Sequence, residues 1–155
     1  MSGERFTLDT NVLVYAADRL AGRKHELALE LVDRAVSRDC VLTLQSLAEF
    51  YHAVTRKGVV PVREAADQVR DWMTLYPVAV ADDSTLGSAL QISAARKLSI
   101  WDAMIVATAA AAGCAVVLSE DMQDGQRLGG VRLCNPFGSG GLSEGVRRLL
   151  EEAAD

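Results

Sequence analysis

The chain has 155 residues, of which half are hydrophobic and 24% are charged, and this composition is typical of a folded globular domain rather than a disordered segment. The formal charge of −5 argues against a broad basic surface for nucleic acid, so a nucleic-acid function would need a local basic patch or a bound cation. The three cysteines are an odd number without Cys-x-x-Cys spacing, which argues against a disulfide framework and against a thiolate metal site.

The longest stretch without a charged residue, 103–119, is interrupted by Gly113. Because a bilayer span needs about 20 predominantly apolar residues, this stretch predicts a helix followed by a buried strand, and we expect no membrane partner. Glu4 and Asp9 interrupt any apolar core of a secretory signal, so we expect a cytoplasmic protein.

Short β-branched runs alternate with longer helical patterns along the chain. The elements expected in chain order are a strand at Arg5–Leu8, a first short helix, a helix at Lys24–Ser37, a strand at Cys40–Leu44, helices from about Leu47 to Lys57 and from Pro61 to about Tyr76, a strand at Val78–Val80, helices at Ser84–Leu98 and Trp101–Ala112, and strands at Ala115–Leu118 and Val131–Cys134. Short apolar strands separated by helices are typical of a parallel sheet that is covered on both faces. The sequence therefore predicts an α/β fold, a three-layer α/β/α domain with a central, mainly parallel sheet of about five short strands.

The last part of the chain has a Gly/Ser-rich composition followed by a short helical pattern. Gly138-Ser139-Gly140-Gly141 predicts a flexible linker, and residues Leu142–Ala154 predict one short helix with a thin apolar face. We therefore expect a domain at residues 1–137 and a tail at residues 138–155. If the linker decouples this tail, removing it should leave folding nearly intact.

Four carboxylates occupy chemically informative places. Asp9 ends the first strand, Glu49 is expected in the first turn of the helix after the second strand, Asp102 in the first turn of the Ala-rich helix, and Asp121 just beyond the fourth strand. Ligands of parallel sheets bind at the edge where the strands end, and the strand order 3-2-1-4-5 would make the first and fourth strands neighbours. The alternative for each acid alone is helix capping, as in a capping box at Ser46–Glu49.

Capping does not explain why Asp9-Thr10-Asn11 directly follows a strand. Converging carboxylates repel one another unless a cation lies between them, and oxygen ligands without cysteine suit Mg²⁺ or Mn²⁺. From the residues alone, Asp9 and Asp102 are the principal candidates for metal ligands. Glu49 and Asp121 would complete the site directly or through water, while Asn11 and Ser119 would orient these ligands.

Four motifs together carry a family resemblance: Leu8-Asp9-Thr10-Asn11-Val12-Leu13, the isolated Glu49, Trp101-Asp102-Ala103-Met104-Ile105 and Leu118-Ser119-Glu120-Asp121-Met122. With them, the chain from about Phe6 to Phe137 resembles the PIN domain and, more narrowly, the VapC-type ribonuclease toxins of bacterial toxin–antitoxin pairs.

The resemblance implies a PIN-like three-layer fold and a Mg²⁺- or Mn²⁺-dependent endoribonuclease that cleaves phosphodiester bonds of RNA. It also implies a cognate antitoxin protein that covers the site. By matching positions, Asp9, Glu49, Asp102 and Asp121 take the catalytic acidic quartet, and Ser119 takes the supporting Ser/Thr. The alternative from another functional class is a catalytically silent PIN-fold module that binds protein partners.

Residues outside the four motifs predict further contacts with RNA and with protein partners. The basic group Arg19, Arg23 and Lys24 is the preferred candidate for RNA contact, and Trp72 and Trp101 are expected in the core or an interface. We expect Glu120 and Asp124 to be exposed acids without a role. The helices after Pro61 and Ser84 carry more apolar surface than one small sheet can cover, which predicts a homodimer or a bound antitoxin segment.

Overall fold

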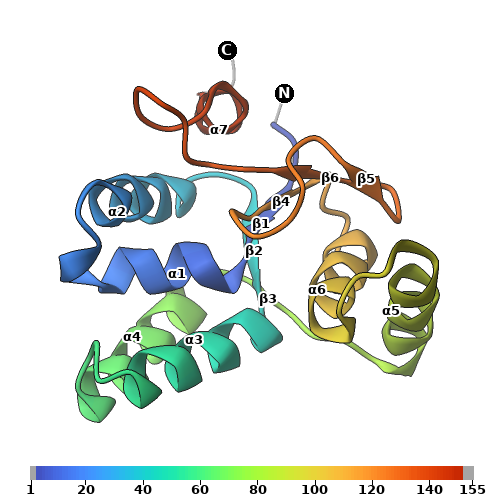
Figure 1. The fold of residues 1–155 in the computed structure, drawn as a ribbon. Helices are drawn as coiled ribbons and strands as arrows, with labels where there is room; N and C mark the ends of the chain where they lie inside the picture. Colours follow the sequence, from blue (N-terminus) through green and yellow to red (C-terminus); the bar gives the residue numbers. More distant parts are fainter. Residues whose placement is uncertain (1–2, 152–155) are drawn as a thin grey trace.

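A β-sheet lies between two layers of helices in the computed structural model, which describes residues 3–151 (Figure 1). Its strands are β1 (Phe6–Leu8), β2 (Cys40–Thr43), β3 (Val78–Ala79), β4 (Val116–Leu118), β5 (Arg127–Leu128) and β6 (Val131–Cys134). One face is covered by α1 (Thr10–Ala17), α2 (Arg23–Ala35), α3 (Leu44–Arg56) and α4 (Val62–Leu75), and the other by α5 (Asp83–Arg96) and α6 (Ile100–Ala111). A 3₁₀ turn, η1 (Arg19–Ala21), follows α1, and α7 (Glu144–Leu150) ends the described chain. Among residues 3–151, no helix combines the length and the hydrophobicity that crossing a bilayer requires.

The strand order is β3-β2-β1-β4-β6-β5, and every pairing is parallel except that of β5 with β6. This confirms the predicted three-layer fold with a mainly parallel sheet. The five predicted strands also take the 3-2-1-4-5 order. The additional strand β5 forms a hairpin with β6 through Gly129 and Gly130, whose φ angles are 56° and 85°. Two successive positive φ angles define the tight turn that suits a two-residue hairpin, and glycine adopts them without strain.

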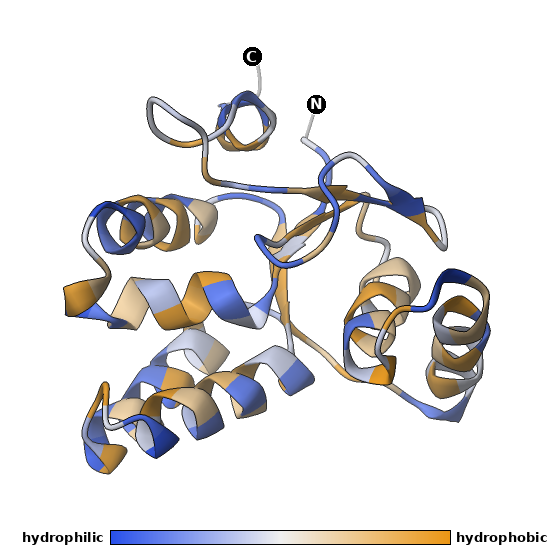
Figure 2. Ribbon diagram, viewed as in Figure 1, coloured by the Kyte–Doolittle hydropathy of each residue, from blue (hydrophilic) through white to orange (hydrophobic). Residues whose placement is uncertain are grey.

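Alternate residues of each strand are buried on opposite faces of the sheet. Leu42 and Leu118 join the core beneath α1–α4, whereas their neighbours Val41 and Val117 join the core beneath α6. Figure 2 shows the hydrophobic residues concentrated in the central strands and on the helix sides that face them. Burial of one such side chain stabilises the folded state by about 1.5–3 kcal/mol. Because both faces of the sheet are buried, successive residues of a strand are all apolar, as the sequence shows.

The start of α3 differs from the expectation. The hydroxyl of Thr43 accepts a hydrogen bond from Ser46 N (3.0 Å), so the helix begins at Leu44 rather than near Leu47. Glu49 consequently lies in the second turn rather than the first, and its carboxylate binds Thr10 and Gln45 instead of forming the capping box that was the alternative explanation for this acid. At α6 the expectation holds, because Ser99 caps the helix and Asp102 lies in its first turn.

The C-terminal segment packs against the core instead of being decoupled from it. Gly138 N donates to Gly141 O (2.8 Å), which closes the expected linker into a turn. The guanidinium of Arg38 donates two hydrogen bonds to the carbonyl oxygen of Leu150, at 2.9 and 2.7 Å. The apolar residues of this segment are buried in the core beneath α1–α4: Leu142, Val146, Leu149 and Leu150. The expectation of a decoupled tail is therefore wrong for residues 138–151, while a domain boundary at Phe137 stays a prediction.

Because Leu150 is fully buried, Leu150→Ala should lower the free energy of unfolding by about 2–4 kcal/mol. Arg147→Ala, on the exposed side of the same helix, should change it by no more than about 0.5 kcal/mol. Urea denaturation of both variants measures the difference. Equal stability of the two would show that α7 contributes nothing to the core.

Candidate active site

Asp9 lies where β1 ends and α1 begins, and only 5% of its surface is exposed. Its backbone N–H donates to Leu118 O (2.9 Å), continuing the pairing between β1 and β4 and bringing Ser119 to its side. The carboxylate accepts hydrogen bonds from Thr10 N and from the hydroxyl of Ser119, both at 2.7 Å. The sheet register thus fixes the orientation of a buried carboxylate.

Asn11 connects this carboxylate to Asp121. Its Nδ2 lies 3.4 Å from Asp9 Oδ2, 3.2 Å from Ser119 Oγ and 3.1 Å from Asp121 Oδ2. Its Oδ1 accepts a hydrogen bond from Glu120 N (3.3 Å), and Ser119 Oγ accepts one from Asp121 N (3.2 Å). The turn after β4 is therefore tied to the first turn of α1, with Asp9 and Asp121 on the two sides of Asn11.

Glu49 reaches the same region from α3. Thr10 Oγ1 donates to its Oε1 (2.7 Å), and Gln45 Nε2 donates to its Oε2 (3.1 Å). Gln45 Nε2 also donates to the carbonyl oxygen of Trp101 (2.9 Å), which connects α3 to the start of α6. Sequence reasoning missed both Thr10 and Gln45, although Gln45 precedes Glu49 by four residues, the spacing at which helical side chains meet.

Carboxylates from four segments of the chain influence one another's ionisation. Burial raises the pKa of Asp9 from 3.8 to about 6, against hydrogen bonds from Ser119 and Thr10 that lower it, and the charges of Asp102 and Glu49 raise it further. Burial also raises the pKa of Asp102, as do the charges of Asp121 and Glu49. All four predicted catalytic acids therefore take part in this electrostatic repulsion, either as the carboxyl whose pKa is raised or as the charge that raises it.

The arrangement is open rather than a closed cage of ligands. Within residues 3–151, no three His, Cys, Asp or Glu side chains form a ready-made metal-binding group. Mg²⁺ commonly keeps several waters and binds proteins through only one or two carboxylates. The donors here are carboxylate oxygens that destabilise one another, so their chemistry fits a hard divalent cation, for which Asp9 and Asp102 could serve as ligands.

The sequence profile of the PIN domain matches residues 6–124. The chain belongs to the PIN domain family. Comparison with curated protein sequences finds no significant match.

Solved structures of PIN proteins share the fold. The toxin VapC20 of Mycobacterium tuberculosis, described as cleaving the sarcin–ricin loop, superposes with a TM-score of 0.60 at 17% identity, covering 75% of this chain and 91% of that chain. A toxin–antitoxin complex from Klebsiella pneumoniae gives 0.62 at 18% identity, covering 84% and 97%. The DNA-bound VapBC complex of Salmonella typhimurium gives 0.61 at 21% identity, covering 84% and 96%.

Glu120 corrects an expectation, because it is neither isolated nor fully exposed. Its side chain is 21% exposed and accepts hydrogen bonds from Tyr15 Oη (2.6 Å) and from Lys24 Nζ (2.5 Å). Burial alone would raise the pKa of Glu120, but these hydrogen bonds and the charge of Lys24 lower it overall. Asp124 also has a structural contact, since its Oδ1 accepts a hydrogen bond from Asn135 N (2.9 Å).

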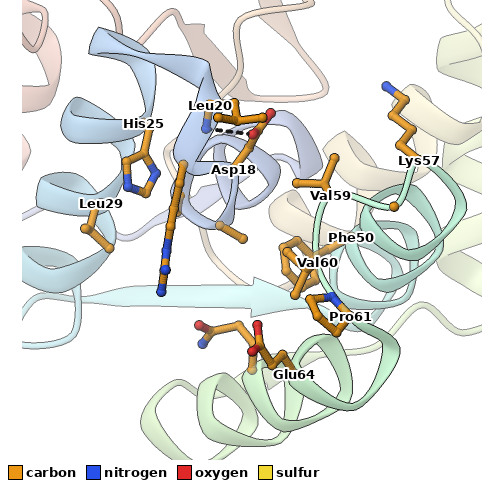
Figure 3. A pocket seen from close by; sticks show the side chains of 15 residues that line it. Asp18, Leu20, His25, Leu29, Phe50, Lys57, Val59, Val60, Pro61 and Glu64 are labelled. Carbon is orange, nitrogen blue, oxygen red and sulfur yellow. Dashed lines mark hydrogen bonds between the residues drawn. The ribbon is translucent and has the colours of Figure 1, made fainter.

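The basic residues expected to contact RNA have different surroundings in the structure. Lys24 pairs with Glu120, and Arg23 pairs with Glu26 at 3.0 Å. Arg19 lines a cleft of 650 Å³ in which His25 and Leu29 face Val59, Val60 and Pro61 (Figure 3). None of the four acids lines this cleft, so it is separate from the acidic site.

The two tryptophans also differ from each other. Trp72 is buried and packs edge-to-face on Phe50, with ring centroids 4.8 Å apart, as expected of a core residue. Trp101 is 60% exposed beside Asp102, which excludes it from the core.

The raised pKa of Asp9 has a consequence for stability. A carboxyl whose folded-state pKa exceeds its unfolded value favours folding below the unfolded pKa, and this contribution is lost as the pH rises through the folded pKa. In EDTA, the wild type should therefore lose up to about 3 kcal/mol of stability relative to Asp9→Asn between about pH 4 and pH 6. Urea unfolding of both proteins over this pH range measures the difference, and parallel stability curves would contradict the assignment.

Proposed function

We propose that this protein is a divalent-metal-dependent endoribonuclease, the toxin of a toxin–antitoxin pair, which cleaves phosphodiester bonds of RNA in the cytoplasm. The observation that carries the proposal is the buried carboxylate of Asp9, which is electrostatically coupled to Asp102 and Glu49 at the strand ends of the sheet. A PIN domain that only binds partners would not need to retain buried, mutually repelling acids. Membership of the PIN family and the shared fold with VapC toxins support the same function.

Each residue of the site has a definable task in this proposal. Asp9 and Asp102 would hold Mg²⁺ or Mn²⁺, which when bound supplies an activated water and neutralises phosphate charge. Thr10 and Gln45 fix the carboxylate of Glu49 from two sides, so that it can receive a proton or orient a water without turning away. The hydrogen bonds of Asn11 and Ser119 hold the carboxylates of Asp9 and Asp121 in place.

An antitoxin is the proposed protein partner. The solved complexes from Klebsiella pneumoniae and Salmonella typhimurium pair proteins of this fold with antitoxins. The acidic edge of this chain would attract a basic segment, and an arginine can donate paired hydrogen bonds to a carboxylate. We therefore expect the antitoxin to place an arginine among Asp9, Glu49, Asp102 and Asp121 and thereby block the metal site.

Asp102→Asn tests the active site. This nearly isosteric change removes one charge, so it should abolish RNA cleavage and raise the metal-free stability by about 1 kcal/mol after screening. It should also reduce the rise in melting temperature that Mn²⁺ gives the wild type, because that rise comes from binding to the native state. Cleavage assays and melts, each with Mn²⁺ and with EDTA, provide the measurements.

If Asp102 only favours the start of its helix, the variant should lose a few tenths of a kcal/mol and remain active. That result, or a wild type that cleaves RNA equally well in EDTA, would contradict the proposed metal site. A folded wild type that cleaves no RNA with Mn²⁺ would favour the silent binding module.

A homodimer is the second proposed assembly. Two apolar grooves of 390 and 290 Å³ share Leu44 and Ala48: one runs along α3 and α4, and the other reaches Val80 and Trp101. In the first groove Met73 is 47% exposed, and beside it α4 also exposes Leu75. Exposed apolar surface of this kind is typical of protein interfaces.

We expect Met73→Glu to dissociate the dimer, because it would place a charge in the apolar interface. Val36→Glu, a matched change of a partly exposed residue outside both grooves, should leave the dimer intact. Analytical ultracentrifugation at micromolar concentration distinguishes the two. A wild type that sediments only as a monomer would contradict the homodimer.

A further inference from the structure

A cluster of four side chains lies directly behind the turn that carries Asp121. Tyr15 from α1, Lys24 from α2, Glu120 and Phe137 form it. Glu120 Oε1 accepts from Tyr15 Oη (2.6 Å), and Glu120 Oε2 accepts from Lys24 Nζ (2.5 Å). Both carboxylate oxygens are thus engaged, each by a donor from a different helix.

Aromatic contacts hold the donors in place. Lys24 Nζ lies 5.3 Å from the centroid of the Tyr15 ring and 5.9 Å from that of Phe137, distances typical of cation–π contacts. The Tyr15 and Phe137 rings meet edge-to-face with centroids 5.5 Å apart. An isolated surface ion pair contributes little because its side chains must be ordered on formation, but here packing already restricts Lys24 and Tyr15.

The position of Glu120 in the chain connects this cluster to the acidic site. Its neighbours Ser119 and Asp121 both contact Asn11, and its own N–H donates to Asn11 Oδ1 (3.3 Å). The turn is therefore held on one side through Asn11 and on the other through the side chain of Glu120. Releasing the second side would allow Asp121 to move relative to Asp9, whereas Ser119 would still be bound to Asp9 through its hydroxyl and to Cys134 O through its N–H.

We propose that Glu120, held by Lys24 and Tyr15, is a positioning residue that fixes the Ser119–Asp121 turn for catalysis. This inference rests on the proposed nuclease function. It also assigns Lys24 a task other than the RNA contact expected from its charge, because its ammonium group is already paired with Glu120.

Lys24→Gln tests the proposal, with Lys24→Arg as the conservative variant that keeps the charge and the donors. Arg34→Gln is the matched control on α2, since Arg34 forms an exposed ion pair with Glu30 on the same helix. Amide hydrogen exchange at Glu120 and Asp121 is measured in EDTA, independently of activity. Single-turnover cleavage and Mn²⁺ titration of the melting temperature follow on the same proteins.

We expect Lys24→Gln to speed exchange of these two amides by about tenfold and to lower the cleavage rate constant by about tenfold at unchanged KM, since one charge-assisted bond is lost. It should also weaken the stabilisation by Mn²⁺. Lys24→Arg should restore all three values to near those of the wild type, and Arg34→Gln should leave them unchanged.

Three results would overturn the inference. Unchanged exchange in Lys24→Gln would show that the cluster does not fix the turn. A raised KM with an unchanged rate constant would show that Lys24 contacts RNA instead. Faster exchange with full activity would show that the turn needs no fixing for catalysis. A wild type that does not cleave RNA would end the proposed function itself, whereas the exchange data would still report on the turn.

Discussion

The buried carboxylate of Asp9 sits at the end of β1, hydrogen-bonded to Ser119 and to the first peptide of α1, with the charges of Asp102 and Glu49 facing it. Burial and repulsion both oppose its ionisation, and two short hydrogen bonds favour it. The other polar contacts of the site follow from this balance. Asn11 lies between Asp9 and Asp121, and Thr10 turns towards Glu49, so the first turn of α1 connects three of the four acids.

The sheet makes this convergence possible. Parallel pairing of β1 with β4 puts Asp9 beside Ser119, and the start of α6 brings Asp102 to the same edge. Because the strands are buried on both faces, a slip in register by one residue would move each side chain into the opposite core, whose packing suits a different side chain, so the two hydrophobic cores fix the geometry of the polar site. Helix α7 contributes to one of these cores from the far end of the chain.

Much of this could be predicted because it depends on local signals. The strand that ends at Asp9 and the Ser99 cap of α6 can each be predicted from a short stretch of sequence. These two predictions put Asp9 at the end of β1 and Asp102 in the first turn of α6. The features that the sequence did not predict depend either on a choice between two possible cap residues or on contacts between residues that are far apart in sequence. Thr43 and Ser46 could both cap α3 by residue type, and in the folded chain Thr43 does so by accepting a hydrogen bond from Ser46 N. Glu120 and Leu150 acquire their contacts from Lys24 and Arg38, which are far away in sequence and close only after folding.

In the proposed nuclease, a divalent cation that the other acids help to attract keeps Asp9 ionised. Carbon-13 NMR of the side-chain carboxyl groups tests it most directly, by following the titration of Asp9 in EDTA and in saturating Mg²⁺, with Asp9→Asn to assign the resonance. We predict a pKa of about 6 for Asp9 without metal and a pKa far lower with Mg²⁺, because an adjacent cation favours the charged form. A titration that is the same with and without Mg²⁺ would contradict it.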